Sequence, residues 1–269
     1  MSVEDVAVVA RNRLPLAWQL IRAMAVAVVR AMAWRVDVCG LEHVPRHSGA
    51  VIAFNHHSYF DFVMAAWSIV RRLHRPVRFL AKREIWESRW TGWIVKLAHA
   101  VPVDRSSAAA RAGAYDAAIH ALASGDLVAV APEQTVSTSF ELLPFRTGAV
   151  RMAQQAGVPI VPAIGWGSQR FASKGKGIHF TWRLPVVVVY GEPIEVAPDA
   201  DVRAATAALQ TVMTRMLHEV QDAYPSPLPG APNWWQPRRL GGGAPDHDEV
   251  LRVHAEREHR WDARREDSG

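Results

Sequence analysis

The sequence predicts an α/β fold, a mostly parallel or mixed sheet flanked by helices. Short apolar runs of strand length alternate with segments of helical periodicity, the pattern of strands joined by crossover helices. The run at 186–190, four valines and one tyrosine, is typical of a buried strand. The chain has 269 residues and is 49% hydrophobic. It is therefore long enough for one domain with a substantial core.

The predicted elements follow in chain order. Strands are expected at 35–39, 50–54, 77–81, 100–103, 127–131, 159–164 and 186–190. Helices are expected at 61–70, 106–123, 147–156 and 202–220. Ser106 or Ser107 can cap the second helix, Gly157 ends the third, and Asp199 or Asp201 can cap the fourth.

Residues 14–34 form the most apolar stretch of the chain. A spanning helix needs about 20 largely uncharged residues, but Arg22 and Arg30 interrupt this one. The same arginines disfavour a secretory signal. With Trp18 and Trp34 near its ends, the stretch is typical of a helix lying in a membrane interface. The alternative is an ordinary amphipathic helix packed on the domain.

The chain is predicted to divide into three segments: a membrane-interface helical segment at 1–34, a catalytic domain at 35–224, and a Pro/Gly-rich, charged tail at 225–269. Six prolines and the run Gly241-Gly242-Gly243 predict that the tail is extended. The tryptophan pair at 234–235 is interpreted as part of a disordered linker. Residues 247–266 are mostly charged and predict at best a weak, solvated helix.

Composition excludes some classes of protein and leaves others open. A content of 21% charged residues excludes a polytopic membrane protein, and 49% hydrophobic residues exclude a disordered chain. The single cysteine, Cys39, excludes an internal disulfide and a cysteine-based zinc site. The net charge of +5 is compatible with binding to nucleic acid or to an anionic membrane surface. The excess of arginine over lysine is also compatible with a coding bias.

The segment 55–61, Asn-His-His-Ser-Tyr-Phe-Asp, carries the clearest chemical signal. It lies between a predicted strand and a predicted helix, at the carboxyl end where α/β sheets gather reactive groups. Asp61 can orient one imidazole nitrogen of His56, which leaves the other free to take a proton from a hydroxyl. In the alternatives, Asp61 is only a helix cap, or His56, His57 and Asp61 bind a metal. Adjacent histidines that point apart disfavour the metal.

The same segment resembles the first motif, Asn-His-x-Ser-x-x-Asp, of the glycerolipid acyltransferases, especially the 1-acyl-sn-glycerol-3-phosphate acyltransferases. Further similar motifs follow in the family's order at 79–84 (FLAKRE), 101–105 (VPVDR), 132–137 (PEQTVS), 143–149 (LPFRTGA) and 158–162 (VPIVP). A nucleophile elbow is absent, since the serine of Gly165-Trp166-Gly167-Ser168 has the wrong spacing.

The resemblance implies a role for each matching residue. His56 would be the general base and Asp61 its orienting partner. Backbone amides at 55–58, with Asn55 and Ser58, or the side chain of Lys82, would stabilise the oxyanion. Residues that would bind or shape the site for the acceptor phosphate are Arg105, Glu133, Thr135 and Arg146.

The resemblance also implies the substrates and the location. An acyl chain would pass from acyl-CoA or acyl-carrier protein to a lysophospholipid, at the sn-2 hydroxyl of 1-acylglycerol-3-phosphate, with no metal or other cofactor. The protein would lie peripherally, as a monotopic protein, on the cytoplasmic face of a bacterial plasma membrane. No nucleic-acid partner is expected.

Two positions depart from the family pattern. Gln134 stands where the family usually has Gly, and Val136 where it usually has Arg. Loss of that arginine removes a phosphate-binding cation, for which Arg146 is a candidate replacement. The alternatives are therefore a different lysolipid or glycolipid acceptor, a neutral variation, or a catalytically idle lipid-binding protein on the same fold.

Overall fold

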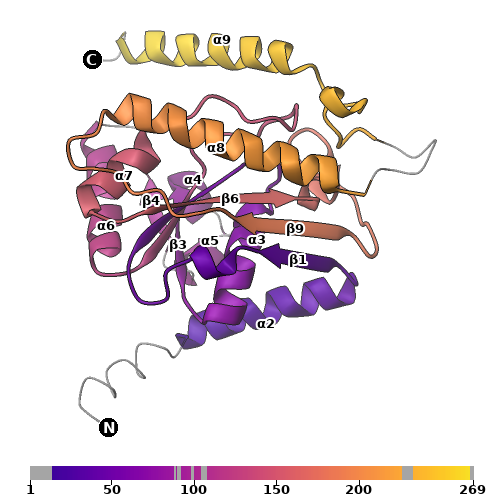
Figure 1. Cartoon of the computed structure of the whole chain (residues 1–269), viewed down its shortest axis with the longest axis horizontal. Coiled ribbons are helices and arrows are strands. Elements are labelled where there is room, and N and C mark those ends of the chain that lie inside the picture. The colour runs from indigo at the N-terminus through magenta and orange to yellow at the C-terminus, as the bar shows by residue number, and fades with distance from the viewer. Residues whose placement is uncertain are drawn as a thin grey trace.

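A computed structural model of the chain describes residues 14–87, 89, 92–97, 100–103, 108–225 and 233–266. Within these residues, a seven-stranded sheet lies at the centre of the molecule in the spatial order β1-β9-β6-β2-β5-β3-β4 (Figure 1). Its strands are β1 (Arg35–Cys39), β2 (Ala50–Phe54), β3 (Val77–Lys82), β4 (Val101–Val103), β5 (Leu127–Val130), β6 (Ile160–Trp166) and β9 (Pro185–Tyr190). The predicted strands are confirmed, with small shifts at their ends.

The sheet is mostly parallel, as predicted, with one reversal. Strands β4, β3, β5, β2 and β6 run parallel to one another, whereas β9 pairs antiparallel with β6 and parallel with β1. Strand β6 leads into β9 through a short two-stranded hairpin, β7 (Ala172–Ser173) and β8 (Gly177–Ile178), with no crossover helix. A connection of this kind returns the chain in the opposite direction.

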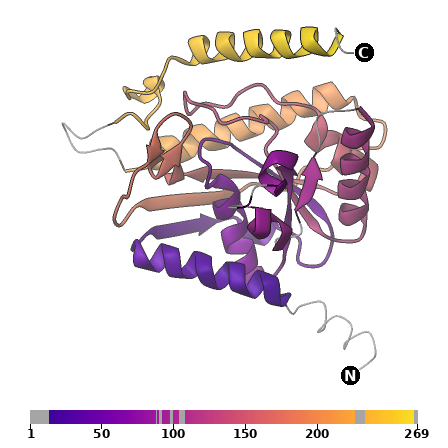
Figure 2. The ribbon, with the colours of Figure 1, turned by 180° about the vertical axis from the view of Figure 1, so that it is seen from behind.

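Helices cover both faces of the sheet (Figures 1 and 2). One face carries α6 (Ala108–Ala123), α7 (Gly148–Ala156) and α8 (Val202–Ala223), and the other carries α2 (Leu16–Ala31) and α3 (Asp61–Ser68). Strand β2 divides its side chains between the two cores: Ala50, Ile52 and Phe54 pack with α2 and α3, and Val51 and Ala53 with the other set. The period of two in a strand produces this division.

The predicted helix ends depend on local chemistry. Helix α7 ends at Gly157, whose φ of 63° is the left-handed conformation that glycine tolerates best. The Asp201 side chain accepts a hydrogen bond from Ala204 N at 2.7 Å and so caps α8. Both predictions are confirmed. The proposed caps of α6, Ser106 and Ser107, lie outside the described residues.

The prediction of an extended, disordered tail is wrong for the part that the structure describes. Trp235 is only 4% exposed; its ring lies 5.7 Å from that of Tyr224 and 4.5 Å beneath the Arg170 guanidinium. Over residues 247–266, where the sequence predicted at best a weak, solvated helix, the structure has the helix α9 (His247–Glu266), which lies beyond α8 in Figure 1. Burial of a tryptophan outweighs the local preference of a Pro/Gly-rich segment for extended chain. The division of the chain into three segments stays a prediction.

Helix α2 confirms the helical segment predicted near the N-terminus. One side of this helix is buried and the opposite side is exposed. Trp18 is buried in the core with α3. Apolar side chains four residues apart line the opposite side with exposed fractions of 48–73%: Leu16, Leu20, Met24 and Val28. Within the described residues, no helix is both long enough and apolar enough to cross a bilayer.

Candidate active site

His56 and Asp61 lie at the carboxyl end of β2, near the middle of the sheet. The chain turns after Phe54, and α3 begins at Asp61. The Nδ1 atom of His56 lies 3.8 Å from Oδ2 of Asp61. This is an ion-pair distance, slightly longer than a hydrogen bond, and catalytic hydrogen bonds are often this loose before substrate binds. The structure therefore brings together the two residues of the predicted pair.

The buried carboxylate of Asp61 holds the loop before α3 through hydrogen bonds. Its Oδ2 accepts hydrogen bonds from His57 N at 2.5 Å and Ser58 N at 2.6 Å, and its Oδ1 accepts one from Ser168 Oγ at 2.6 Å. The donors on its own chain segment precede the helix, so Asp61 does not cap α3. Its carboxylate is fixed by three donors and is thereby held beside the His56 ring. Sequence reasoning missed Ser168; the only signal was its place just beyond the predicted strand at 159–164.

The two adjacent histidines have different environments. The side chain of His56 is 22% exposed. His57 is completely buried, with its ring edge-on to Phe140 and Trp166 and its Nδ1 3.1 Å from Asn55 Nδ2. Burial lowers the pKa of His57 to about 4, so this ring is neutral at pH 7. Only His56 of the pair is open to a ligand. Among the described residues, no group of three His, Cys, Asp or Glu side chains is placed to hold a metal ion.

Glu133 supports the loop that carries His56. Its Oε1 accepts a hydrogen bond from His56 N at 2.7 Å, and its Oε2 accepts one from Leu143 N at 2.8 Å. Burial raises the pKa of Glu133 to about 8, although the two amides lower it in part. With both oxygens engaged, the side chain fixes the backbone of His56 and cannot turn toward a phosphate.

The predicted oxyanion donors in this loop are already in use. The amides of His56, His57 and Ser58 each donate to a carboxyl oxygen of Glu133 or Asp61, as described above. The Asn55 side chain pairs with the backbone of Gly165, at 3.0 and 2.7 Å. Ser58 Oγ donates to Ala172 O at 2.6 Å. The expectation that these groups face an oxyanion is therefore corrected: they hold the loop in place.

The remaining predicted positions lie in two other loops or outside the described part. Thr135 is partly exposed, and its Oγ1 lies 3.5 Å from Nζ of Lys174. The Arg146 side chain is exposed, and its backbone N donates to Pro132 O at 3.0 Å. Arg105 lies outside the described residues, as does the side chain of Lys82, whose backbone ends β3. The structure therefore leaves the phosphate-binding predictions for Arg105 and Arg146 open.

The two departures from the family pattern have different surroundings. Val136 is 6% exposed, so its side chain belongs to the interior. Gln134 is exposed and has a φ of 57°, the left-handed region. The family's usual glycine would adopt this conformation without the penalty that a side chain carries.

Replacing Gln134 with glycine should therefore stabilise the fold. We expect Gln134→Gly to raise the free energy of unfolding by up to about 1 kcal/mol, because about 1–2 kcal/mol of left-handed strain is relieved and part of it is offset by unfolded-state entropy. Gln134→Ala is the matched control, since it removes the amide but keeps the strain. Urea unfolding of the three proteins measures the difference. Equal stability of the glycine and alanine variants would contradict the explanation.

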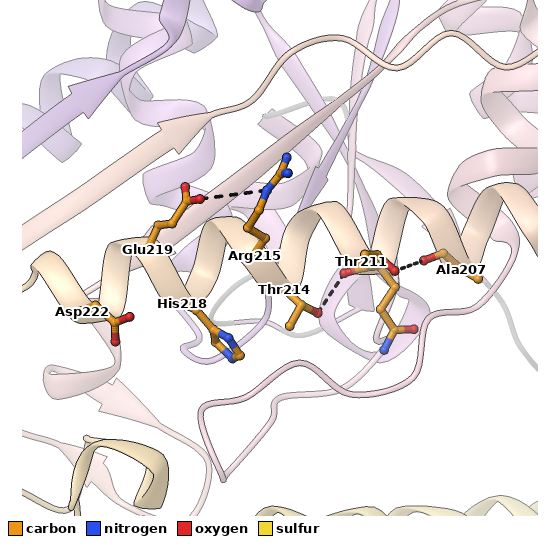
Figure 3. A pocket seen from close by; sticks show the side chains of 8 residues that line it. Ala207, Thr211, Thr214, Arg215, His218, Glu219 and Asp222 are labelled. Carbon is orange, nitrogen blue, oxygen red and sulfur yellow. Dashed lines mark hydrogen bonds and ion pairs between the residues drawn. The ribbon is translucent and has the colours of Figure 1, made fainter.

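A hollow of about 690 Å³ lies elsewhere, along the outer side of α8 (Figure 3). All the residues that line it come from this one helix. Some of their interactions stay within the helix: Thr211 and Thr214 donate to backbone oxygens four residues earlier, and Arg215 lies 4.0 Å from Glu219. Others reach neighbouring segments: Gln210 Oε1 accepts from Phe145 N at 3.1 Å, and His218 Nε2 lies 3.0 Å from Glu141 Oε2. None of the hydrogen bonds and ion pairs described for the lining residues reaches residues 55–61, so the candidate site remains the one at the end of β2.

Comparison with known proteins shows which proteins this chain resembles. The family model described as "Acyltransferase" matches residues 35–166, the stretch that contains β1, the His56 loop and β6. The chain is 28% identical over 202 residues to the 1-acyl-sn-glycerol-3-phosphate acyltransferase of Bacillus subtilis, an alignment that covers 74% of this chain and 95% of that protein. It is 31% identical over 170 residues to the enzyme of the same name from Limnanthes alba, covering 59% of this chain and 54% of that protein.

A solved structure has the same fold. The crystal structure of the 1-acyl-sn-glycerophosphate (LPA) acyltransferase from Thermotoga maritima superposes with a TM-score of 0.64 at 22% identity, covering 78% of this chain and 81% of that one. The sequence match over the site-bearing strands, the curated relatives and this fold agree with each other. The chain is therefore similar to the acyltransferase family over residues 35–166 and, within that family, to the 1-acyl-sn-glycerol-3-phosphate acyltransferases.

Proposed function

We propose that the protein transfers an acyl chain from an acyl thioester to the free hydroxyl of a lysophospholipid. The acceptor is 1-acylglycerol-3-phosphate, acylated at sn-2 to give phosphatidic acid. The observation that carries the proposal is the partly exposed His56 ring held beside the buried Asp61 carboxylate. Acyl-CoA or acyl-carrier protein is the co-substrate, and no further cofactor is required.

The chemistry needs one base and no protein nucleophile. Asp61 orients the His56 ring through Nδ1, and Nε2 takes the proton of the acceptor hydroxyl as its oxygen attacks the thioester carbonyl. The tetrahedral intermediate then collapses, the C–S bond breaks, and the imidazolium returns the proton to the leaving thiolate. Asp61 favours the imidazolium that forms between these two proton transfers.

The acceptor assignment is supported by the similar proteins, whose names specify 1-acyl-sn-glycerol-3-phosphate. Thr135 Oγ1 lies 3.5 Å from Nζ of Lys174. Both residues are on loops that contact the His56 loop, since Ser137 N donates to His56 O and Ser173 Oγ donates to His57 O. In this proposal they contact the acceptor headgroup, together with Arg105 and Arg146. A lysine near this position supplies a cation that Val136 does not.

The location proposed for the protein is the cytoplasmic face of a bacterial plasma membrane, to which it binds peripherally. The exposed row of Leu16, Leu20, Met24 and Val28 on α2 supports it, because an apolar row on a helix with arginines suits the headgroup–acyl boundary. Trp18, on the other side of the helix, is part of the core. Tests of membrane binding should therefore change the exposed row and leave the helix in place.

A transfer assay tests the proposal. The purified protein is given radiolabelled acyl-CoA or acyl-carrier protein and a panel of lysophospholipids in mixed micelles, and the products are separated by chromatography. We expect phosphatidic acid from 1-acylglycerol-3-phosphate. Product only from another lysolipid or from a glycolipid would replace the acceptor, and no product from any acceptor would favour the idle lipid-binding alternative.

A further inference from the structure

The segment 172–183 is an exposed apolar part of the described surface. It comprises β7, β8 and the chain leading to β9. Its side chains Ile178, Phe180 and Trp182 have exposed fractions of 63%, 82% and 65%. Isolated exposed apolar residues are ordinary, but three at alternate positions of one segment are not. We therefore expect a binding partner or a membrane to cover this apolar surface.

The same segment is entirely basic or neutral. It contains Lys174, Lys176 and Arg183 and no acidic residue. Tryptophan and phenylalanine beside lysine and arginine is the composition of proteins at a membrane interface, where rings enter the headgroup region and cations meet anionic lipids. Charge complementarity thus selects an anionic bilayer as the occupant.

The segment contacts both the C-terminal end of α2 and the loop of His56. Toward α2, Arg183 N donates to Met32 O at 2.9 Å, and Trp34 Nε1 donates to Thr181 O at 3.1 Å. Toward the site, Ser173 Oγ donates to His57 O at 2.8 Å. The two ends of one short segment therefore contact the helix that carries the candidate lipid surface and the loop of the candidate active site.

We propose that the 172–183 segment is a second membrane-contacting element, which inserts Ile178, Phe180 and Trp182 into the interface of an anionic bilayer. Membrane binding by this segment does not depend on the proposed function. Its consequence does: the bilayer is held against the loop that carries His56, so that a lysophospholipid reaches the ring without leaving the membrane.

Site-specific fluorescence tests insertion directly. In a Cys39→Ser background, which removes the single native cysteine, Phe180→Cys is labelled with an environment-sensitive fluorophore. Arg215→Cys, on the outer side of α8, is the matched control site. With phosphatidylglycerol/phosphatidylcholine vesicles we expect a blue shift and quenching by lipid-borne quenchers at 180 and neither at 215. No change at 180, or equal changes at both sites, overturns the proposal.

Variants give an independent measure. We expect the double variant Phe180→Ser/Trp182→Ser to bind the vesicles about tenfold more weakly in sedimentation, while Phe180→Trp/Trp182→Phe keeps its affinity. Lys176→Glu should weaken binding more than Arg215→Glu, with the difference lost at high salt. A blue shift at 180 that appears without vesicles, when only the protein concentration is raised, would indicate that a second copy of the chain covers the segment. That result would overturn the proposal that the occupant is a bilayer.

The two proposals fail separately. If the double serine variant binds vesicles as the wild type does and acyl transfer is intact, the proposal that 172–183 contacts the membrane is wrong and the proposed function stands. If the label at 180 inserts into the bilayer but no lysophospholipid is acylated, the proposed function is wrong and the proposal of a membrane-contacting segment is retained.

Discussion

Replacing His56 with alanine should lower turnover about 10²–10⁴-fold, the range expected for loss of a general base. The fold should be preserved, because the ring is partly exposed and its Nδ1 has no hydrogen-bond partner within the described structure. The measurement is acyl transfer from labelled acyl-CoA, alongside circular dichroism and a thermal melt. Imidazole added to the alanine variant should restore part of the activity if the missing group is a base.

His43 offers a matched control for this variant. It is also a partly exposed histidine paired with a carboxylate, since its Nε2 lies 3.1 Å from Glu192 Oε1, but it lies outside the His56 loop. His43→Ala should therefore keep wild-type turnover. If His56→Ala stays folded and turns over as fast as His43→Ala, His56 is not the base.

Replacing Asp61 with alanine should have the largest effect on stability. The change leaves the amides of His57 and Ser58 and the hydroxyl of Ser168 without their acceptor in a buried place. An unsatisfied buried polar group costs about 1–3 kcal/mol, so three of them should lower the free energy of unfolding by about 3 kcal/mol or more. That is a large part of the total stability of a typical domain. Urea unfolding measures it.

Asp61→Asn separates the charge of Asp61 from its size. This variant keeps one acceptor oxygen and should fold, but it loses the charge that favours the His56 imidazolium, so turnover should fall by about 10²-fold or more. Ser168→Ala is the control for the hydrogen bonds of Asp61, because it removes one donor and keeps the carboxylate. It should lower the free energy of unfolding by about 1 kcal/mol and leave turnover nearly unchanged. Normal turnover of Asp61→Asn would contradict the pairing of Asp61 with His56.

The fold could be read from the sequence wherever the signal was local. Strand β2 is an uninterrupted apolar run, α7 ends at a glycine and α8 begins after an aspartate. Each is decided by residues within a few positions of each other. The reversal of β9 relative to β6 was not predictable, because a hairpin too short for a crossover helix replaced one of the expected parallel connections.

The tail shows how composition alone misleads. Its prolines and glycines predicted extended chain, yet Trp235 finds Tyr224 and Arg170 on the domain. Those partners precede Trp235 along the chain and meet it only after β6 and α8 are folded. Propensity acts on neighbours in sequence, whereas the burial of a large ring depends on what lies beside it in space.

The sequence by itself indicated the resemblance to the acyltransferases, the position of the candidate site at the end of a predicted strand, and His56 and Asp61 as its candidate residues, because these depend on ordered motifs and local patterns. Only the tertiary structure decided that His57 is a neutral core residue, that Glu133 and Ser168 are bound to the loop of His56 and to Asp61, and that the loop amides are occupied. The physical reason is distance along the chain. Glu133 is 77 residues from His56, and Ser168 is 107 from Asp61, so their hydrogen bonds exist only once the sheet has brought those strands together.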